Sequence, residues 1–241
     1  MTQGQSGQRP GLWQRFEQVA GTYETWYETR RGQRADQAER ALLEWLVGQG
    51  PGTKTLLEVG CGTGHFAAWL ERRRHRVVGL DRSPAMLAEL HRRHPQLPVV
   101  LGDGHTLPFR DGAVDVTLFV TTFEFLERPA GALREAVRVS RRGLVVLALN
   151  RWSLGGLSRR WGSARRGAIL AHAQDVTIRS LCDWVRTAAG SRLTGLRWAS
   201  TLFPDGLWAW RSRVPLGDVI GISAQLAKPD PQGDPLTGRA T

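Results

Sequence analysis

Apolar and polar residues alternate along the chain in two patterns, one typical of amphipathic helices and one typical of buried strands. Between residues 32 and 47, apolar residues recur every three or four positions, which predicts a helix that ends at the sequence GQGPG. Short runs of consecutive apolar residues follow, and each predicts a strand buried on both faces. Ser83 followed by Pro84 is a strong helix-start signal. The predicted strands are residues 55–59, 76–80, 98–102, 113–120 and 144–149, and the predicted helices between them are residues 65–73, 83–94 and 129–139.

This order of strands and helices predicts an α/β fold with a mostly parallel sheet. Beyond residue 150 the pattern loosens into a basic, glycine-rich stretch, which we interpret as an insertion at about 151–175. A further helix is predicted at 178–189, and residues 192–200 and 217–227 are candidates for two closing strands.

The sequence LLEVGCGTGHF (56–66) places three glycines directly after the first predicted strand. Gly60, Gly62 and Gly64 allow a tight turn and a close approach of a ligand, and ligands of such sheets bind beyond the carboxyl ends of the strands. The dinucleotide fingerprint G-x-G-x-x-G does not fit, because the third glycine comes one residue too early and His65 stands in its place. Glu58 is also a poor neighbour for a pyrophosphate. An NAD-dependent oxidoreductase is therefore disfavoured and a cationic ligand favoured.

Acidic residues mark three successive strand ends. Glu58 lies at the end of the first predicted strand, Asp81 at the end of the second, and Asp103 after the third. Because the carboxyl ends of parallel strands meet at one edge, these carboxylates are expected to converge on one crevice, where Asp81 could accept both hydroxyls of a ribose. Each residue alone could instead cap a turn or a helix. All three in register beside the glycine loop favour a binding site.

Four segments resemble, in order, the motif series of class I S-adenosylmethionine-dependent methyltransferases. They are LLEVGCGTG, VVGLDRSPAML, LGDGHTLPFRDGAVDV and RVSRRGLVVLALNRWS, and the likeness covers about residues 20–200. It is strongest to the subgroup of ubiquinone/menaquinone-type and small-molecule methyltransferases. The resemblance implies a Rossmann-like fold with a seven-stranded sheet and helices on both faces. It also implies S-adenosylmethionine as cofactor, with S-adenosylhomocysteine as product.

The resemblance implies a role for residues at each strand end. Glu58 would orient the amino group of the cofactor, and Asp81 would hold the ribose. Asp103 would bind the adenine amino group. The loop under the methionine part would be Gly60, Cys61, Gly62 and Gly64; the neighbours of the adenine would be Arg82, Met86, Gly104 and His105; and the floor near the sulfonium would be Thr121, Thr122 and Phe123.

Candidates for chemistry and for acceptor binding are fewer. Glu124, between two phenylalanines, is a possible general base if the acceptor must lose a proton, although it could equally be a loop carboxylate paired with an arginine. His105 is a second possible base. By resemblance, the sequence YETWYETRRG folds over the cofactor and substrate, so that Tyr23, Trp26 and Tyr27 would contact the acceptor, as would Phe123 after the fourth strand. The three residues of the N-terminal sequence could instead pack into the core, because Tyr23 shares a helical face with Tyr27 or with Trp26.

The resemblance and the composition together give a domain plan. Residues 1–10 and 228–241 are polar and are predicted to be disordered, residues 11–50 form an N-terminal helical cover, and residues 51–227 form the methyltransferase domain. No apolar run approaches a membrane span. Cys61 and Cys182 imply no disulfide framework, so a cytoplasmic protein is expected, and no metal site is predicted.

The chain carries a net charge of +11, which raises nucleic acid or an anionic membrane as a partner. Only two of the 33 cations are lysines, and the arginines fall in small clusters at the ends of predicted helices, where they are simply solvated in many proteins. The leading prediction is methyl transfer to a small-molecule acceptor by in-line substitution. An RNA methyltransferase and a non-catalytic methyltransferase-like subunit remain alternatives, and the sequence leaves the oligomeric state open.

Overall fold

The computed structural model describes residues 12–48, 52–153, 173–202 and 211–228. The predicted disordered end at 1–10 lies outside the described residues, as do the central part of the predicted insertion and all but the first residue of the predicted tail. The domain boundaries therefore stay a prediction.

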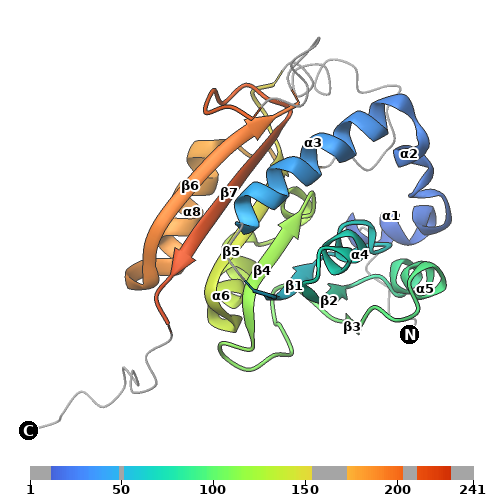
Figure 1. Cartoon of the computed structure of the whole chain (residues 1–241), viewed down its shortest axis with the longest axis horizontal. Coiled ribbons are helices and arrows are strands. Elements are labelled where there is room, and N and C mark those ends of the chain that lie inside the picture. The colour runs from blue at the N-terminus through green and yellow to red at the C-terminus, as the bar shows by residue number, and fades with distance from the viewer. Residues whose placement is uncertain (1–11, 49–51, 154–172, 203–210, 229–241) are drawn as a thin grey trace, which may run out of the picture.

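A single seven-stranded sheet forms the centre of the described structure (Figure 1). Its strand order is β3-β2-β1-β4-β5-β7-β6, and only β7 runs antiparallel to its neighbours. The predicted mostly parallel, Rossmann-like sheet is confirmed. The strands are β1 (Thr55–Val59), β2 (Arg76–Asp81), β3 (Val99–Leu101), β4 (Val114–Val120), β5 (Ser140–Leu149), β6 (Leu193–Thr201) and β7 (Val219–Leu226).

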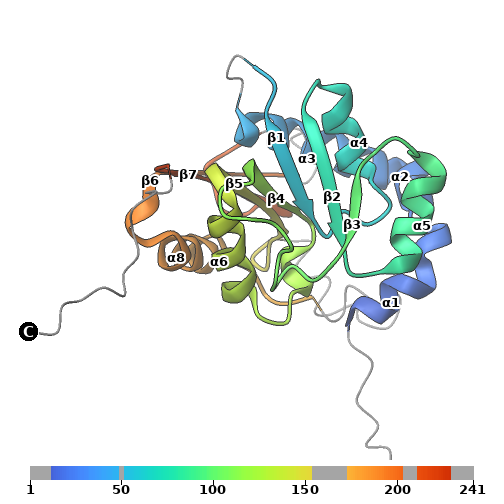
Figure 2. The same cartoon turned by 90° about the horizontal axis from the view of Figure 1, so that it is seen from below.

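Helices cover both faces of the sheet, as Figure 2 shows from below. One face packs against apolar residues of α6 and α8, and the opposite face packs against those of α3, α4 and α5. Every residue of β4 is buried, because this strand lies in the middle of the sheet between both helical layers. The covering helices are α3 (Arg30–Val47), α4 (His65–Arg72), α5 (Pro84–Arg93), α6 (Pro129–Val139) and α8 (Ile178–Ala189).

The start of β5 differs from the prediction. The strand begins at Ser140, four residues earlier than expected, and follows α6 without a loop. The polar sequence SRRG hides this start, but each polar residue has a partner: Ser140 hydrogen-bonds Thr117 at 2.7 Å, and Arg141 lies 3.2 Å from the Asp115 carboxylate. Side-chain pairing therefore supports the strand where hydrophobicity does not.

The N-terminal segment folds into several helices beside α4 and α5 (Figure 1). They are α1 (Leu12–Val19), the short 3-10 helix η1 (Ala20–Thr22), α2 (Thr25–Glu28) and then α3. Thr29 starts α3 by accepting a hydrogen bond from the Gly32 amide on its hydroxyl at 2.9 Å. In the described part of the chain, none of the helices combines the length and the apolar character that a membrane crossing needs.

Candidate functional site

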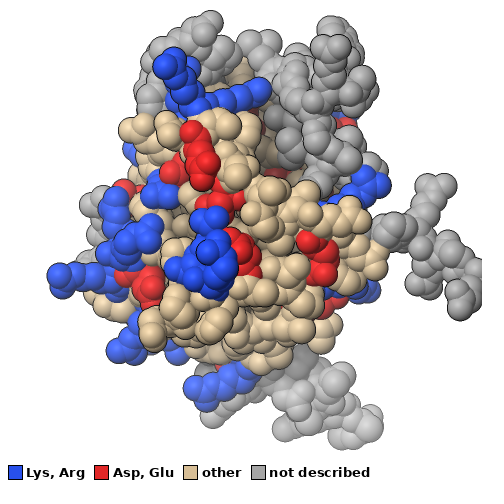
Figure 3. Space-filling model, turned by 90° about the vertical axis from the view of Figure 1, so that its right-hand side faces the viewer, with Lys and Arg blue, Asp and Glu red and all other residues tan. Residues whose placement is uncertain are grey.

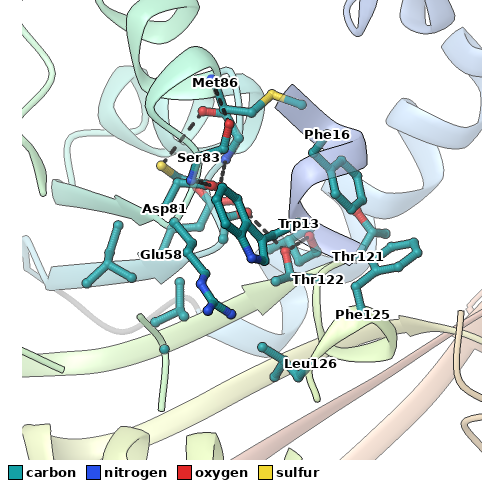
Figure 4. Close-up of a pocket in the computed structure, with 18 of the residues that line it drawn as sticks. Trp13, Phe16, Glu58, Asp81, Ser83, Met86, Thr121, Thr122, Phe125 and Leu126 are labelled. Atoms are coloured by element: carbon teal, nitrogen blue, oxygen red, sulfur yellow. Dashed lines mark hydrogen bonds between the residues drawn. The ribbon is translucent and has the colours of Figure 1, made fainter. Parts of the chain in front are cut away.

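A cavity opens at the carboxyl ends of β1, β2 and β4, under the N-terminal helices (Figure 4). Glu58, Asp81 and Asp103 all line it, as expected from their register at successive strand ends. Two further 3-10 helices complete the described elements, η2 (Phe123–Phe125) beside the cavity and η4 (Gly190–Arg192) after α8.

The glycine loop between β1 and α4 is held by its backbone. Gly60 and Cys61 both donate their amides to the Leu80 carbonyl of β2, at 2.7 and 3.1 Å. Gly60 has φ +72°, and a Cβ there would lie 2.1 Å from Thr122 Cγ2, so only glycine fits. The Thr122 hydroxyl donates back to the Gly60 carbonyl at 3.0 Å. The loop and the end of β4 are thereby locked together.

Gly64 does not have the position that was predicted for it. It is absent from the residues that line the cavity, although Gly60, Cys61 and Gly62 do line it. Gly64 instead starts α4 with φ +85°, and a Cβ there would lie 2.8 Å from Leu90 Cγ. Its role is close packing of α4 against α5, which explains why a third glycine follows so soon after the second.

Asp81 links the second strand end to the glycine loop. One carboxylate oxygen accepts the Gly62 amide at 2.8 Å, and the other accepts the Ser83 amide at 2.9 Å. Ser83, not Asp81, caps α5, because its hydroxyl accepts the Met86 amide at 3.1 Å. Burial raises the pKa of Asp81, and the backbone hydrogen bonds from Ser83 and Gly62 oppose that rise. The helix-cap alternative for Asp81 therefore fails.

Glu58 presents a buried carboxyl group to the cavity. Its side chain is 2% exposed, and its Oε2 has no hydrogen-bond partner among the described residues. Burial raises its pKa to about 8. A buried oxygen without a partner is unfavourable unless a ligand supplies a donor. An ammonium group of a ligand would satisfy this oxygen and favour the charged form of the carboxyl.

His105 lines the cavity but is not placed to act as a base. Its Nδ1 lies 2.6 Å from Asp103 Oδ1, and its Nε2 accepts the Arg128 amide at 3.2 Å. Both ring nitrogens are therefore engaged, which leaves no lone pair for a proton from an acceptor. The geometry makes His105 a support for Asp103 instead of a catalytic group.

The segment after β4 separates into cavity and core residues. Thr121 and Thr122 line the cavity, and Thr121 has φ +48°, a strained conformation for a β-branched residue that is typical of functional sites. Phe123 is fully buried against Phe119 and Trp184, so it belongs to the core and not to the cavity.

Glu124 is also placed differently from the prediction of a general base. It is fully buried and is not among the residues that line the cavity. The turn of η2 directs its side chain toward the end of β5, where its Oε1 accepts the Leu149 amide at 3.3 Å. In this arrangement it joins two strand ends and does not reach an acceptor in the cavity.

Sequence comparison identifies the family to which this site belongs. Residues 57–147 match the family described as "Methyltransferase domain". Malonyl-[acyl-carrier protein] O-methyltransferase of Serratia marcescens is 31% identical over 211 residues, which cover 84% of this chain and 76% of the relative. The chain belongs to the class I S-adenosylmethionine-dependent methyltransferases. The ubiquinone/menaquinone-type subgroup stays a prediction.

Solved structures show the same methyltransferase fold. One is an S-adenosylmethionine-dependent methyltransferase from Thermotoga maritima described as a possible histamine N-methyltransferase; it is 24% identical, with a TM-score of 0.74, over 89% of this chain and 99% of that chain. A magnesium protoporphyrin IX methyltransferase from Synechocystis with bound S-adenosylhomocysteine is 15% identical, with a TM-score of 0.64, over 89% and 97% of the two chains.

The cavity of this methyltransferase fits its cofactor. The unpartnered Glu58 oxygen suits the amino group, the glycine loop leaves room for the methionine part, and Asp81 lies where a ribose hydroxyl pair can be bound. Arg82, Met86, Gly104 and the threonines after β4 also line the cavity. Their individual cofactor contacts stay predictions, because they rest on placement alone.

The N-terminal helices supply the aromatic wall of the methyltransferase site. Tyr23 and Tyr27 line the cavity, whereas Trp26 is 45% exposed on α2 and does not. Trp13 and Phe16 of α1 also line it, which the sequence reasoning missed (Figure 4). Their spacing of three residues, continued by the buried Ala20, is a helical apolar pattern that could have revealed them.

Proposed function

We propose that this methyltransferase acts on a small-molecule acceptor that binds beside Thr121, under the aromatic wall of Trp13, Phe16, Tyr23 and Tyr27. One observation carries the proposal: the cavity is covered by aromatic residues and is acidic. Four carboxyl groups, two imidazoles and a single guanidinium line it, those of Glu58, Asp81, Asp103, Glu127, His65, His105 and Arg82. Such a lining favours neutral or cationic groups and disfavours a phosphate backbone.

The residues of the chain serve mainly to bind and align. S-adenosylmethionine, when bound, supplies an electrophilic methyl group on a sulfonium and a thioether leaving group. The glycine loop and Asp81 hold the cofactor, and the end of β4 at Thr121 positions the acceptor for in-line attack on the methyl group. The aromatic residues of α1 exclude water, so that water does not compete with the acceptor for the position beside the methyl group.

Methylation of RNA is the alternative that the charge of the chain raises. The basic side chains on the face seen in Figure 3 are interspersed with acidic ones and do not form an unbroken stripe. Some arginines of the chain are also paired with carboxylates: Arg92 and Arg93 both lie 2.6 Å from Glu89 on α5. Nucleic-acid sites need clustered cations that remain available to phosphates. The distribution therefore favours the small-molecule proposal.

The proposal is tested with S-adenosylmethionine labelled on its methyl group. The purified chain is incubated with a bacterial extract that has been separated into a small-molecule filtrate, a protein fraction and an RNA fraction. We expect label to be transferred into the filtrate. Label in RNA alone, with a steep loss as salt is raised, would replace this proposal by the RNA alternative. Label in the protein fraction alone would favour a carrier-bound acceptor, as the name of the Serratia relative suggests.

A further inference from the structure

Three side chains of the N-terminal helices meet one histidine at the mouth of the cofactor cavity. We use the term N-terminal cover for residues 12–47, which comprise α1, η1, α2 and α3. His65 belongs to the body of the enzyme, begins α4 directly after the glycine loop, and lines the cavity. Its neighbours in the cover are Glu24, Tyr27 and Asp36.

The contacts hold the imidazole ring at both edges and on one face. His65 Nδ1 lies 3.1 Å from Glu24 Oε2, and His65 Nε2 lies 2.6 Å from Asp36 Oδ1. The Tyr27 ring stacks on the imidazole with centroids 3.6 Å apart and planes 8° apart. The Thr63 hydroxyl of the loop donates to the second oxygen of Glu24. The cover is therefore attached to the glycine loop through one small cluster.

The two carboxylate contacts favour a charged histidine. Ionised carboxylates only accept hydrogen bonds, so each ring nitrogen that faces one must carry a proton. Burial alone would lower the pKa of His65, but its hydrogen bonds with Asp36 and Glu24 outweigh burial and raise it. Both carboxyl groups in turn have lowered pKa values: burial would raise them, but His65 together with Thr63 beside Glu24 and Arg40 beside Asp36 outweighs burial.

Other charged groups also surround the imidazole ring. Arg40 Nη2 of α3 lies 3.0 Å from His65 Nε2, and because a guanidinium only donates, this contact favours the neutral ring. Arg40 Nε, however, donates to Asp36 Oδ1 at 2.6 Å, and Asp36 Oδ1 lies closer to His65 Nε2 than Arg40 does. Glu58 of β1 and Glu39 of α3 lie farther away, and each favours the charged ring only once it is ionised, because burial raises both pKa values to about 8. The balance of the surrounding groups is acidic, in agreement with an imidazolium.

We propose that His65 is a positioning residue whose protonated ring fastens the N-terminal cover over the bound cofactor, so that loss of its proton loosens the part of the cover that carries Glu24 and Tyr27, while α3 stays packed on the sheet, and speeds cofactor exchange. The proposal rests on the cofactor of the family and not on the identity of the acceptor. It therefore stands or falls separately from the small-molecule proposal.

The direction of the pH effect distinguishes His65 from Glu58, and the His65→Gln variant distinguishes it from Glu39, whose ionisation at higher pH also weakens the cover. The attachment is complete while His65 is charged and is lost as the pH rises through its raised pKa. Glu58 behaves in the opposite way, because its ionisation at higher pH strengthens the hold on an ammonium group. A cofactor that leaves faster at higher pH therefore points to the histidine and not to this carboxyl group.

The test is the rate of S-adenosylhomocysteine dissociation, followed by stopped-flow tryptophan fluorescence, because Trp13 lines the cavity. For the wild-type chain we expect dissociation about tenfold faster at about pH 8.5 than at about pH 6, the effect of one lost charge-assisted hydrogen bond. His65→Gln should dissociate rapidly at both pH values. His91→Gln, an exposed histidine on α5, serves as the matched control and should keep the wild-type profile.

Two further variants keep the proposal testable if His65→Gln is poorly folded. Asp36→Asn and Glu24→Gln each remove one carboxylate partner, so the rise in dissociation rate should move to lower pH. A wild-type rate that does not change with pH, or a His65→Gln variant that keeps the wild-type profile, would overturn the proposal.

Discussion

The two sides of the cofactor cavity are built in different ways. The strand-end side consists of the glycine loop, Asp81 and Asp103, and backbone hydrogen bonds fix much of it, such as those from Gly60 and Cys61 to Leu80. The N-terminal cover is held by side chains that come from distant parts of the sequence, such as Glu17 of α1, whose carboxylate accepts the Ser83 hydroxyl at 2.5 Å and the Ala85 amide at 3.2 Å. We expect the first side to bind the cofactor and the second to control how it is enclosed.

The largest expected effect is on the free energy of unfolding, and it distinguishes a core residue from a cavity residue in the segment after β4. Phe123→Ala should lower the free energy of unfolding by about 3–5 kcal/mol, because the ring is fully buried. Phe125 lines the cavity, and its ring centroid lies 5.1 Å from that of Phe16 on α1. Phe125→Ala should cost less stability and mainly weaken cofactor binding. Urea unfolding and calorimetry of both variants would show the contrast, and equal stability losses would contradict it.

On the strand-end side, Asp81→Ala should weaken S-adenosylhomocysteine binding about 100-fold. The change removes both the proposed ribose ligand and the carboxylate that holds the Gly62 amide, and hydrogen bonds of a charged group are worth about 1.5–3 kcal/mol each. Isothermal titration calorimetry measures the loss. Asp183→Ala, an exposed carboxylate on α8, is the control. Unchanged affinity in Asp81→Ala would refute the ribose assignment.

Within the cover, Glu39→Gln should stabilise the protein at about pH 8 by roughly 2 kcal/mol and have little effect at about pH 5. Burial, with Asp36 and Glu124 nearby, raises the pKa of Glu39 to about 8, above its unfolded value. The wild-type chain therefore loses stability as the pH rises toward that value, and glutamine removes the loss. Thermal unfolding at both pH values checks this. Glu44→Gln, on the same helix and half exposed, should show no such gain.

The smallest expected effect is on cofactor binding, and it should differ between two tryptophans of the cover. Trp13→Ala should weaken cofactor binding about fivefold, because its ring lines the cavity and the Arg82 guanidinium lies 5.2 Å from its centroid. Trp26→Ala should leave binding unchanged, because that side chain is exposed. Direct titration of both variants is sufficient, and an equal effect in the two would mean that α1 does not enclose the cofactor.

The two sides also differ in how far the sequence predicted them. β1 and α8 have the predicted bounds, and the carboxyl groups of Glu58, Asp81 and Asp103 meet in one cavity as expected. The periodicity of apolar residues was sufficient to predict these elements. The position of the three carboxyl groups at strand ends was sufficient to predict their convergence, because a parallel sheet brings successive strand ends to one edge.

The remaining features depend on contacts that no local pattern encodes. In the cluster at His65, the imidazole contacts Asp36 and Glu24, which lie 29 and 41 positions away from it in the sequence. From the sequence alone, His65 was notable only because it stands where the dinucleotide fingerprint has its third glycine. Glu124 and Trp26 have plausible neighbours in sequence, but the turn of η2 and the short helix α2 direct them away from the cavity. Side-chain direction in short helices is set by tertiary packing, which the sequence pattern does not show.

The central claim is that the strand-end loops bind a methyl donor and not a dinucleotide. Isothermal titration calorimetry of the purified, folded chain with S-adenosylmethionine, and separately with NAD, tests it most directly. We expect micromolar binding of S-adenosylmethionine and no binding of NAD. Binding of NAD, or no heat with S-adenosylmethionine from a folded sample, would contradict it.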